Sequence, residues 1–359
     1  MAQSALVNPV RESKVSAMGD IELNDISAFL SHHAPELPPV TALEKFPTGQ
    51  SNPTYKLVCG DQAFVLRAKP SGQLLKSAHL VEREYWVMRA LGESAVPVPR
   101  MIALAEDETS PIGRAFFVME MVEGRIFWDP ATPELSLSER SAVYDEMNRV
   151  LTALHEVDVD AAGLTDFGKP GNYFARQTDR WSKQYLASRT DPSAQMDRLM
   201  DWLEQNMPED DGQVALVHGD FRLDNMIFAP DEPKVLALLD WELSTLGHPL
   251  ADLAYQCMQW RLPHDGGMRG LGGLDRAALG LPDEEGYVAR YCARRGIVPP
   301  ENWSFYLAFA FFRLAAILEG VVRRAKDGNA SNPETARTYS AAIPVLAAEA
   351  NRITQGAPS

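Results

Sequence analysis

The stretch LVHGDFRLDNMIFAPDEPKVLALLDWE, residues 216–242, decides the fold of this 359-residue chain. Two short hydrophobic runs, residues 214–217 and 235–239, have the composition of β-strands, and we expect them to form a strand pair. A polar side chain follows each run, Asp220 after the first and Asp240 after the second. A strand pair within a mainly helical region is typical of a scaffold that holds polar side chains in fixed positions.

The order of the polar residues is similar to the catalytic parts of a kinase. In that pattern an aspartate faces the hydroxyl that accepts phosphate, and a later asparagine and a second aspartate bind Mg²⁺. These roles would fall to Asp220, Asn225 and Asp240, respectively. Amide and carboxylate oxygens suit a hard cation, and a carboxylate can orient an alcohol and accept its proton. Each residue alone could be a polar turn residue, but the ordered set favours phosphoryl transfer.

The flanking regions predict two lobes of different composition. Residues 41–122 contain short apolar runs around one helical pattern at residues 80–91, which predicts a small antiparallel sheet with one helix. Residues 136–359 show mainly helical periodicity and begin with an S-x-x-E capping box at Ser136. The expected fold class is therefore α+β, with a small antiparallel β lobe and a larger, mainly helical lobe.

Composition excludes several classes of protein. The net charge of −15 argues against a nucleic-acid partner, because nucleic-acid binders usually carry a basic surplus. Three widely spaced cysteines (Cys59, Cys257 and Cys292) do not form a disulfide scaffold and fit a reducing compartment. Residues 1–19 contain no apolar signal segment, and charged residues interrupt the apolar run 305–322. We therefore expect a cytoplasmic protein with no membrane partner.

Three segments resemble the aminoglycoside phosphotransferase family: HGDFRLDNMIF (218–228), LALLDWELSTLGHPLADLAY (236–255) and LTDFGKPGNYFARQ (164–177). They are most similar to the kinase-like domain fused to some acyl-CoA dehydrogenases. The resemblance implies a two-lobed protein-kinase-like fold that uses ATP and Mg²⁺. It implies a tail at residues 1–24, a small nucleotide-binding lobe with its hinge at residues 25–122, and a large lobe with the catalytic loop and acceptor site at residues 123–359.

The same resemblance implies how the small lobe would hold ATP. A phosphate-covering loop would comprise Gly49, Gln50, Ser51 and Asn52, although the segment is not G-x-G-x-x-G and Pro53 lacks an amide donor. Arg67 takes the place of the lysine that holds the α- and β-phosphates, with Glu84 as its carboxylate partner. Lys69, two residues on, is a rival for the phosphate contact.

The hinge would bind adenine through backbone atoms of Glu120, Met121 and Val122. Candidate apolar neighbours of the base, with ordinary core packing as an equal alternative, are Leu57, Val65 and Leu238.

Two further residues are implied to support the catalytic loop. Asp252 would accept hydrogen bonds from the loop backbone, and His218 would point into the core. Glu242 is either close to the metal site or a plain turn residue. Residues 166–168 spell DFG, but they precede Asp220, so the metal-binding role falls to Asp240 and the literal motif is interpreted as a loop turn.

The function implied is ATP- and Mg²⁺-dependent transfer of the γ-phosphate to the hydroxyl of a small molecule, because no long activation segment for a protein substrate follows Asp240. The acceptor would be a hydroxyacyl-CoA, with a functional link to an acyl-CoA dehydrogenase. The alternatives are an aminoglycoside, amino-alcohol or sugar acceptor, and an inactive nucleotide-binding module, which Arg67 in place of lysine would favour. Cationic contacts for CoA could come from two clusters: Arg290, Arg294 and Arg295, or Arg323, Arg324 and Lys326. The alternative, which we favour, is that both clusters are solvated helix faces with a structural role only.

Overall fold

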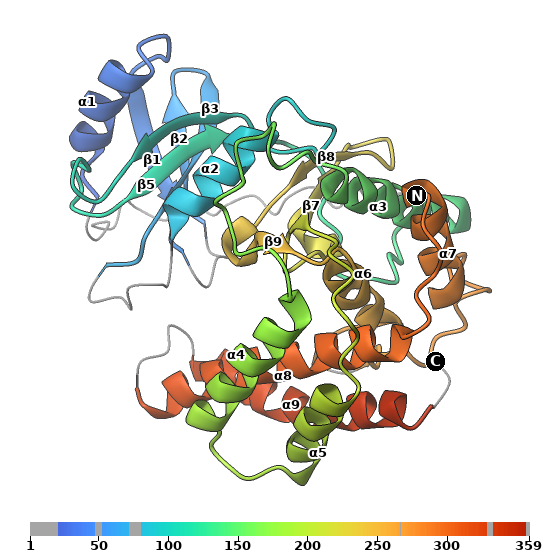
Figure 1. Cartoon of the computed structure of the whole chain (residues 1–359). Coiled ribbons are helices and arrows are strands. Elements are labelled where there is room, and N and C mark those ends of the chain that lie inside the picture. Colours follow the sequence, from blue (N-terminus) through green and yellow to red (C-terminus); the bar gives the residue numbers. More distant parts are fainter. Residues whose placement is uncertain (1–20, 47–51, 72–79, 266, 329–332, 357–359) are drawn as a thin grey trace.

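The computed structural model describes residues 21–46, 52–71, 80–265, 267–328 and 333–356. A small sheet-containing lobe lies beside a larger helical lobe (Figure 1), which confirms the predicted α+β, kinase-like fold class.

The small lobe is a five-stranded antiparallel sheet in the order β1-β2-β3-β5-β4. Its strands are β1 (Val40–Lys45), β2 (Thr54–Cys59), β3 (Gln62–Ala68), β4 (Met101–Ala105) and β5 (Phe116–Glu120). The predicted hairpin forms between β2 and β3, where Gly60 adopts a φ of 63°, a conformation that glycine tolerates well.

Helices cover both faces of this sheet. Leu57 and Leu66 pack with the apolar side chains of α1 (Leu23–His33), which begins within the segment expected to be a tail. Val65 and Phe117 instead pack with α2 (Val81–Leu91) and the large lobe. Because side chains alternate along a strand, Arg67 lies on the same face as Val65. Leu57 therefore belongs to the core under α1 and not beside a bound base.

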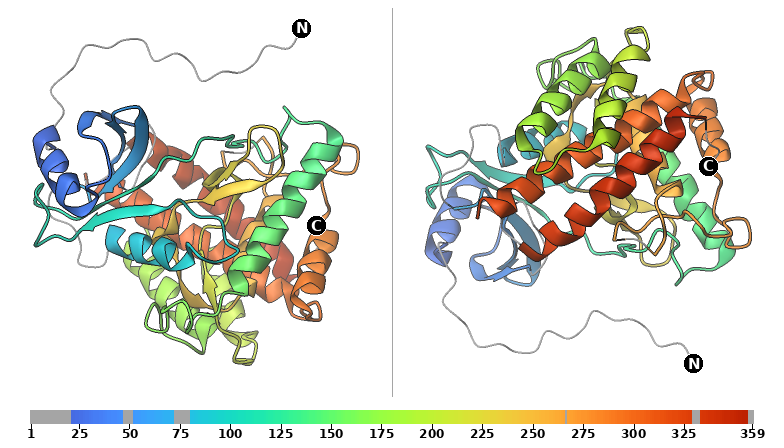
Figure 2. Two further views of the ribbon diagram at one scale, coloured as in Figure 1. Left: turned by 90° about the horizontal axis from the view of Figure 1, so that it is seen from above. Right: turned by 90° about the horizontal axis from the view of Figure 1, so that it is seen from below.

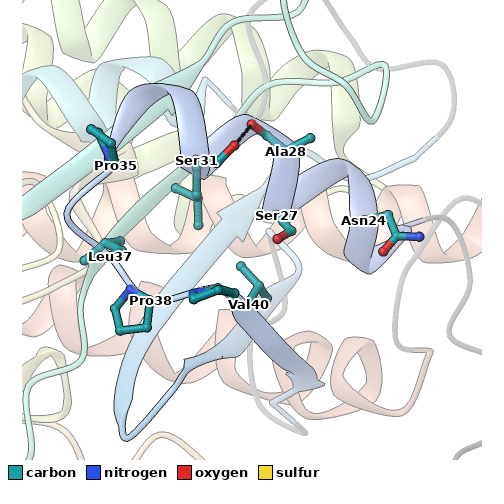
Figure 3. Close-up of a pocket in the computed structure, with 10 residues that line it drawn as sticks. Asn24, Ser27, Ala28, Ser31, Pro35, Leu37, Pro38 and Val40 are labelled. Carbon is teal, nitrogen blue, oxygen red and sulfur yellow. Dashed lines mark hydrogen bonds between the residues drawn. The ribbon is translucent and has the colours of Figure 1, made fainter.

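A shallow cavity of about 310 Å³ lies between α1 and the start of β1 (Figure 3). Its lining is proline, aliphatic side chains and small polar residues such as Asn24 and Ser31. None of the lining side chains is ionisable, so this cavity offers no acid–base chemistry.

The large lobe consists mainly of helices, of which α4, α5, α6 and α9 pack against α8 while α3 and α7 pack against each other (Figure 2). They are α3 (Leu137–His155), α4 (Tyr173–Ser188), α5 (Ala194–Gln205), α6 (Leu250–Cys257), α7 (Glu284–Arg295), α8 (Trp303–Lys326) and α9 (Pro333–Thr354), with 3₁₀ turns η1 (Leu223–Asn225), η2 (Trp241–Leu243) and η3 (Met258–Trp260). The predicted capping box is present at Ser136. By length and hydropathy α8 could span a membrane, but 89% of its most apolar window is buried inside the fold.

Two small two-stranded sheets carry the polar motif, and one prediction about them was wrong. β6 (Ala215–Val217) pairs with β9 (Thr245–Gly247), and β7 (Met226–Phe228) pairs with β8 (Val235–Leu238). The two apolar runs expected to pair with each other therefore belong to different sheets. Strand β7 forms a local hairpin with β8. With only three residues between polar neighbours, β7 is too short to show a strand periodicity in the sequence.

The segment that joins the lobes is hydrogen-bonded to strand β7 of the β7–β8 hairpin. Arg125 and Phe228 exchange two backbone hydrogen bonds of 2.8 Å each. A Cβ atom at Gly124 would lie 2.2 Å from the Phe228 carbonyl oxygen, so only glycine allows this close approach. The linker between the lobes is thus attached directly to the strand that follows the catalytic loop.

Candidate active site

The loop between β6 and β7 brings two residues of the predicted trio into contact. The Asn225 side-chain nitrogen donates to Asp220 Oδ2 at 3.1 Å and to the Asp220 backbone oxygen at 2.8 Å. Tyr255 of α6 donates its hydroxyl to Asp220 Oδ1 at 2.6 Å. Because the nitrogen of Asn225 is used by Asp220, its amide oxygen is the atom suited to a cation.

Asp240, the third member, lies at the end of the neighbouring strand. The Leu239 amide donates to the Asn225 carbonyl oxygen at 2.8 Å, which ties the two segments together. Asp240 has a φ of 66°, a left-handed conformation that aspartate and asparagine tolerate better than most residues. Its Oδ1 atom lies 2.6 Å from Nη2 of Arg67, which reaches across from the small lobe.

Arg67 connects the two lobes through a pair of carboxylates. Its Nε atom lies 3.2 Å from Oε2 of Glu84, and Glu84 Oε1 accepts a hydrogen bond of 3.1 Å from Asn52. Burial lowers the pKa of Arg67, but Glu84, Asp240 and Glu242 more than offset this effect and raise the pKa above its usual value. The guanidinium therefore stays charged, and Glu242 lies near enough to the cluster to affect it.

Lys69, the rival for the phosphate contact, has other partners. Its Nζ atom lies 2.5 Å from Oε1 of Glu82 and 2.6 Å from Oδ2 of Asp107. The structure thus brings Arg67, and not Lys69, to Asp240. Of the expected phosphate-covering loop, Asn52 is buried, while Gly49, Gln50 and Ser51 lie outside the described residues.

The expected hinge follows β5. The amide of Glu120 already donates to the Arg100 carbonyl oxygen at 2.9 Å. An amide donor for adenine would therefore have to come from Met121 or Val122, both of which are only partly buried.

Asp252 and His218 bind the backbone of the catalytic loop through hydrogen bonds. Asp252 is buried and accepts hydrogen bonds from the amides of His218 at 2.6 Å and Gly219 at 2.8 Å. Burial raises the pKa of Asp252, but hydrogen bonds from His155 and the Gly219 amide keep it below its usual value. His218 Nδ1 accepts from the Asp220 amide at 3.2 Å, so Nε2 must carry the proton that it donates to the Leu239 carbonyl oxygen at 2.9 Å.

Sequence reasoning missed three residues that contact this loop. They are Tyr255, Arg222 and Arg313. Burial and the adjacent Asp220 carboxylate raise the pKa of Tyr255 well above its usual value, so its hydroxyl stays a donor. Arg313 Nη1 donates to the Gly219 carbonyl oxygen at 2.8 Å, and Arg222 Nε lies 3.4 Å from Asp220 Oδ1. A single arginine inside the apolar run 305–322 was the available signal for Arg313, because a buried guanidinium requires an acceptor.

The cationic clusters considered for CoA are engaged elsewhere. Arg290 and Arg294 both pair with Asp145 of α3 at 2.6 and 2.8 Å. Arg323 pairs with Asp327, and Lys326 lies 3.7 Å from Asp191. These contacts support the interpretation of both clusters as structural helix faces.

The donor set fits a hard cation held jointly with phosphate groups. Asn225 and Asp240 supply amide and carboxylate oxygens, the ligands that Mg²⁺ prefers. Within the described ranges, no group of three or more His, Cys, Asp and Glu side chains could hold a metal ion. A magnesium ion at Asn225 and Asp240 would therefore complete its coordination with oxygens from water and from nucleotide phosphates.

Residues 42–291 match the model of the family described as "Phosphotransferase enzyme family". The chain belongs to this family. The match spans β2, the catalytic loop and most of α7, and it includes the predicted site residues from Gly49 to Asp252, whereas Arg313 lies beyond it.

Curated relatives are named as acyl-CoA dehydrogenase family members. Member 10 of Mus musculus is 50% identical over 291 residues, which cover 81% of this chain and 27% of the relative. Member 11 of Homo sapiens is 40% identical over 316 residues, which cover 86% of this chain and 40% of the relative. The chain thus spans less than half the length of these relatives, as expected if it is similar to their kinase-like part.

Solved structures confirm the fold. A crystal structure named as a candidate aminoglycoside phosphotransferase from Ralstonia eutropha is 48% identical, with a TM-score of 0.84 and coverage of 94% of this chain and 99% of the other. The ternary complex of aminoglycoside phosphotransferase APH(4)-Ia with AMP-PNP and hygromycin B is 18% identical, with a TM-score of 0.59 and coverage of 92% and 98%. The second likeness concerns the fold alone.

Proposed function

We propose that the protein is a small-molecule kinase that uses ATP and Mg²⁺ to phosphorylate a hydroxyl group. The observation that carries this proposal is the meeting of Asp220, Asn225 and Asp240 with the Arg67–Glu84 pair of the small lobe. Phosphoryl transfer needs a positioned nucleophile and positive charge around the transferred group. The cluster supplies side chains for both needs at the junction of the lobes.

In this proposal each residue has one task. Asp220 orients the acceptor hydroxyl and takes its proton, while the new O–P bond forms and the bond from the γ-phosphorus to the bridging oxygen breaks. Arg67, held by Glu84, neutralises charge on the phosphates. Mg²⁺, when bound, would supply further positive charge to the triphosphate.

We infer that the acceptor is a hydroxyacyl-CoA and that the reaction is linked to an acyl-CoA dehydrogenase. The names of the relatives support this inference. Phosphorylation would convert hydroxide, a poor leaving group, into phosphate, a better one.

An assay of ADP release separates these possibilities. The panel comprises hydroxyacyl-CoAs, sugars, choline-like amines and aminoglycosides, each with ATP and Mg²⁺. We expect turnover above background with hydroxyacyl-CoAs. Turnover on aminoglycosides alone would overturn the acyl-CoA acceptor and leave the kinase. Magnesium-dependent ATP binding without ADP formation on any acceptor would identify an inactive nucleotide-binding module.

A cytoplasmic location remains part of the proposal. The three cysteines, Cys59, Cys257 and Cys292, are free and buried, which fits a reducing compartment.

A further inference from the structure

Two consecutive residues of helix α2, Arg83 and Glu84, make contacts in different lobes. Glu84 is buried and contacts Arg67 within the small lobe. Arg83, its neighbour, reaches the large lobe, where its Nη2 atom donates to the carbonyl oxygens of Phe167 at 2.7 Å and Ser244 at 3.4 Å. The Arg83 guanidinium also lies over the Phe167 ring, with its central carbon 4.0 Å from the ring centroid. The planar guanidinium can lie flat over the ring while Nη2 donates to both carbonyl oxygens, whereas a lysine ammonium could donate but could not stack on the ring.

The two partners of Arg83 are themselves held firmly. Phe167 precedes Gly168, where a Cβ atom would lie 2.4 Å from Thr245 Oγ1 and 2.6 Å from the Leu246 amide, so this loop is pressed against β9. Ser244 donates its hydroxyl to the Trp241 carbonyl oxygen at 2.6 Å. The literal DFG segment is therefore a fixed support for α2 and not a metal site.

These supports are parts of the active-site scaffold. Ser244 follows η2, which begins at the residue after Asp240, and β9 pairs with β6, which leads into the catalytic loop. Arg67 must reach Glu84 on α2 and Asp240 beside η2 at the same time. The distance between α2 and η2 thus decides whether Arg67 can span both carboxylates.

We propose that Arg83 is a positioning residue, which fastens α2 to Phe167 and Ser244 and so holds Glu84 and Arg67 in the geometry that binds nucleotide phosphates. The proposal rests on the proposed function, because it concerns the same phosphate site. Arg83 acts through Glu84 and does not itself touch the nucleotide.

Calorimetric titration of the full chain with Mg²⁺ and AMP-PNP tests the proposal without an acceptor. We expect Arg83→Met to raise the dissociation constant about tenfold, a usual size for coupling between neighbouring sites. Arg83→Lys should be nearly as weak, because charge without the planar fork is insufficient. Arg89→Met is the matched control: it lies on the same helix, and its side-chain contacts within the described residues are with Tyr85 and the Trp86 ring, at 5.4 Å, of α2 itself.

A double-mutant cycle separates positioning from general stabilisation. Once Glu84→Gln has weakened the link to Arg67, adding Arg83→Met should cause little further loss of affinity. If Arg83→Met lowers the melting temperature too far for titration, Phe167→Leu replaces it, because this variant removes the ring on which Arg83 lies. The positioning role would be overturned if the double variant lost affinity by the product of the factors for Glu84→Gln and Arg83→Met. It would also be overturned if both Arg83→Met and Phe167→Leu kept the affinity of the parent protein. Failure of the parent protein to bind the nucleotide would overturn the proposed function, and this proposal with it.

Discussion

At the scale of single residues, the geometry around Asp220 fixes both of its side-chain oxygens. Tyr255 donates to one oxygen and Asn225 to the other. Arg222 contributes positive charge next to the same carboxylate. An ionised carboxylate in a fixed orientation is suited to accept a proton from an alcohol that approaches it.

Replacement of Asp220 should separate chemistry from nucleotide binding. Asp220→Asn keeps the shape but removes the proton acceptor, so we expect turnover to fall about 10³-fold, within the range for acid–base groups. Affinity for ATP with Mg²⁺ should change by less than about threefold, because binding rests on other side chains. ADP release with the best acceptor and calorimetric titration measure the two quantities.

The matched control for this substitution is Asp166→Asn in the literal DFG segment. Asp166 is exposed, and we expect turnover to be unchanged. Turnover of Asp220→Asn above a tenth of the parent value would contradict the role of Asp220.

At the scale of elements, buried polar contacts join α3, α6 and α7 beneath the catalytic loop. His155 of α3 lies with Nε2 at 3.4 Å from Asp252 of α6 and with Nδ1 at 2.7 Å from the hydroxyl of Tyr291 of α7. Asp252 in turn binds the loop amides. The position of the loop therefore depends on the packing of three helices that are distant in sequence.

This contact predicts a loss of stability in acid. Burial lowers the pKa of His155, although Asp252 opposes this effect, so the ring is neutral in the fold. The unfolded chain takes up a proton below about pH 6.5, so stability present above that pH is lost as the pH falls toward the folded pKa, by up to about 1.4 kcal/mol per pH unit. His155→Gln should weaken this dependence between about pH 7 and pH 5.

Urea unfolding at several pH values measures the effect. His32→Gln is the control, because His32 is exposed at the end of α1 and its removal should leave the slope unchanged. Equal slopes for the parent and His155→Gln would show that His155 does not control the acid sensitivity.

At the scale of the whole molecule, the lobes meet through a few defined contacts. Arg67 reaches Asp240, Arg83 reaches Phe167 and Ser244, and the linker at Gly124 is fastened to β7. A nucleotide bound between the lobes would add contacts to both sides. Binding to the folded state alone raises its stability by mass action.

Magnesium should therefore decide how much ATP stabilises the protein. With ATP and Mg²⁺ at about 100 times the dissociation constant, we expect about 2.7 kcal/mol of stabilisation. A chelator should remove most of it, as should Asp240→Asn, a variant chosen because asparagine tolerates the φ of 66° at this position. Thermal melting with and without chelator measures both effects, and equal stabilisation in every case would contradict the metal site.

The sequence by itself predicted the two lobes, the β2–β3 hairpin and the order of Asp220, Asn225 and Asp240, and the family resemblance added Glu84 with Arg67 and Lys69 as rivals. These features depend on local periodicity and on residues in a recognisable order close to strand ends. Only the tertiary structure decided that β6 pairs with β9, that Arg67 rather than Lys69 reaches Asp240, and that Tyr255, Arg313 and Arg83 support the site. The physical reason is that these contacts join segments that are distant in the chain. Arg313 and Arg83 also bind backbone carbonyl oxygens, which every residue has, so the sequence does not indicate which residue is the partner.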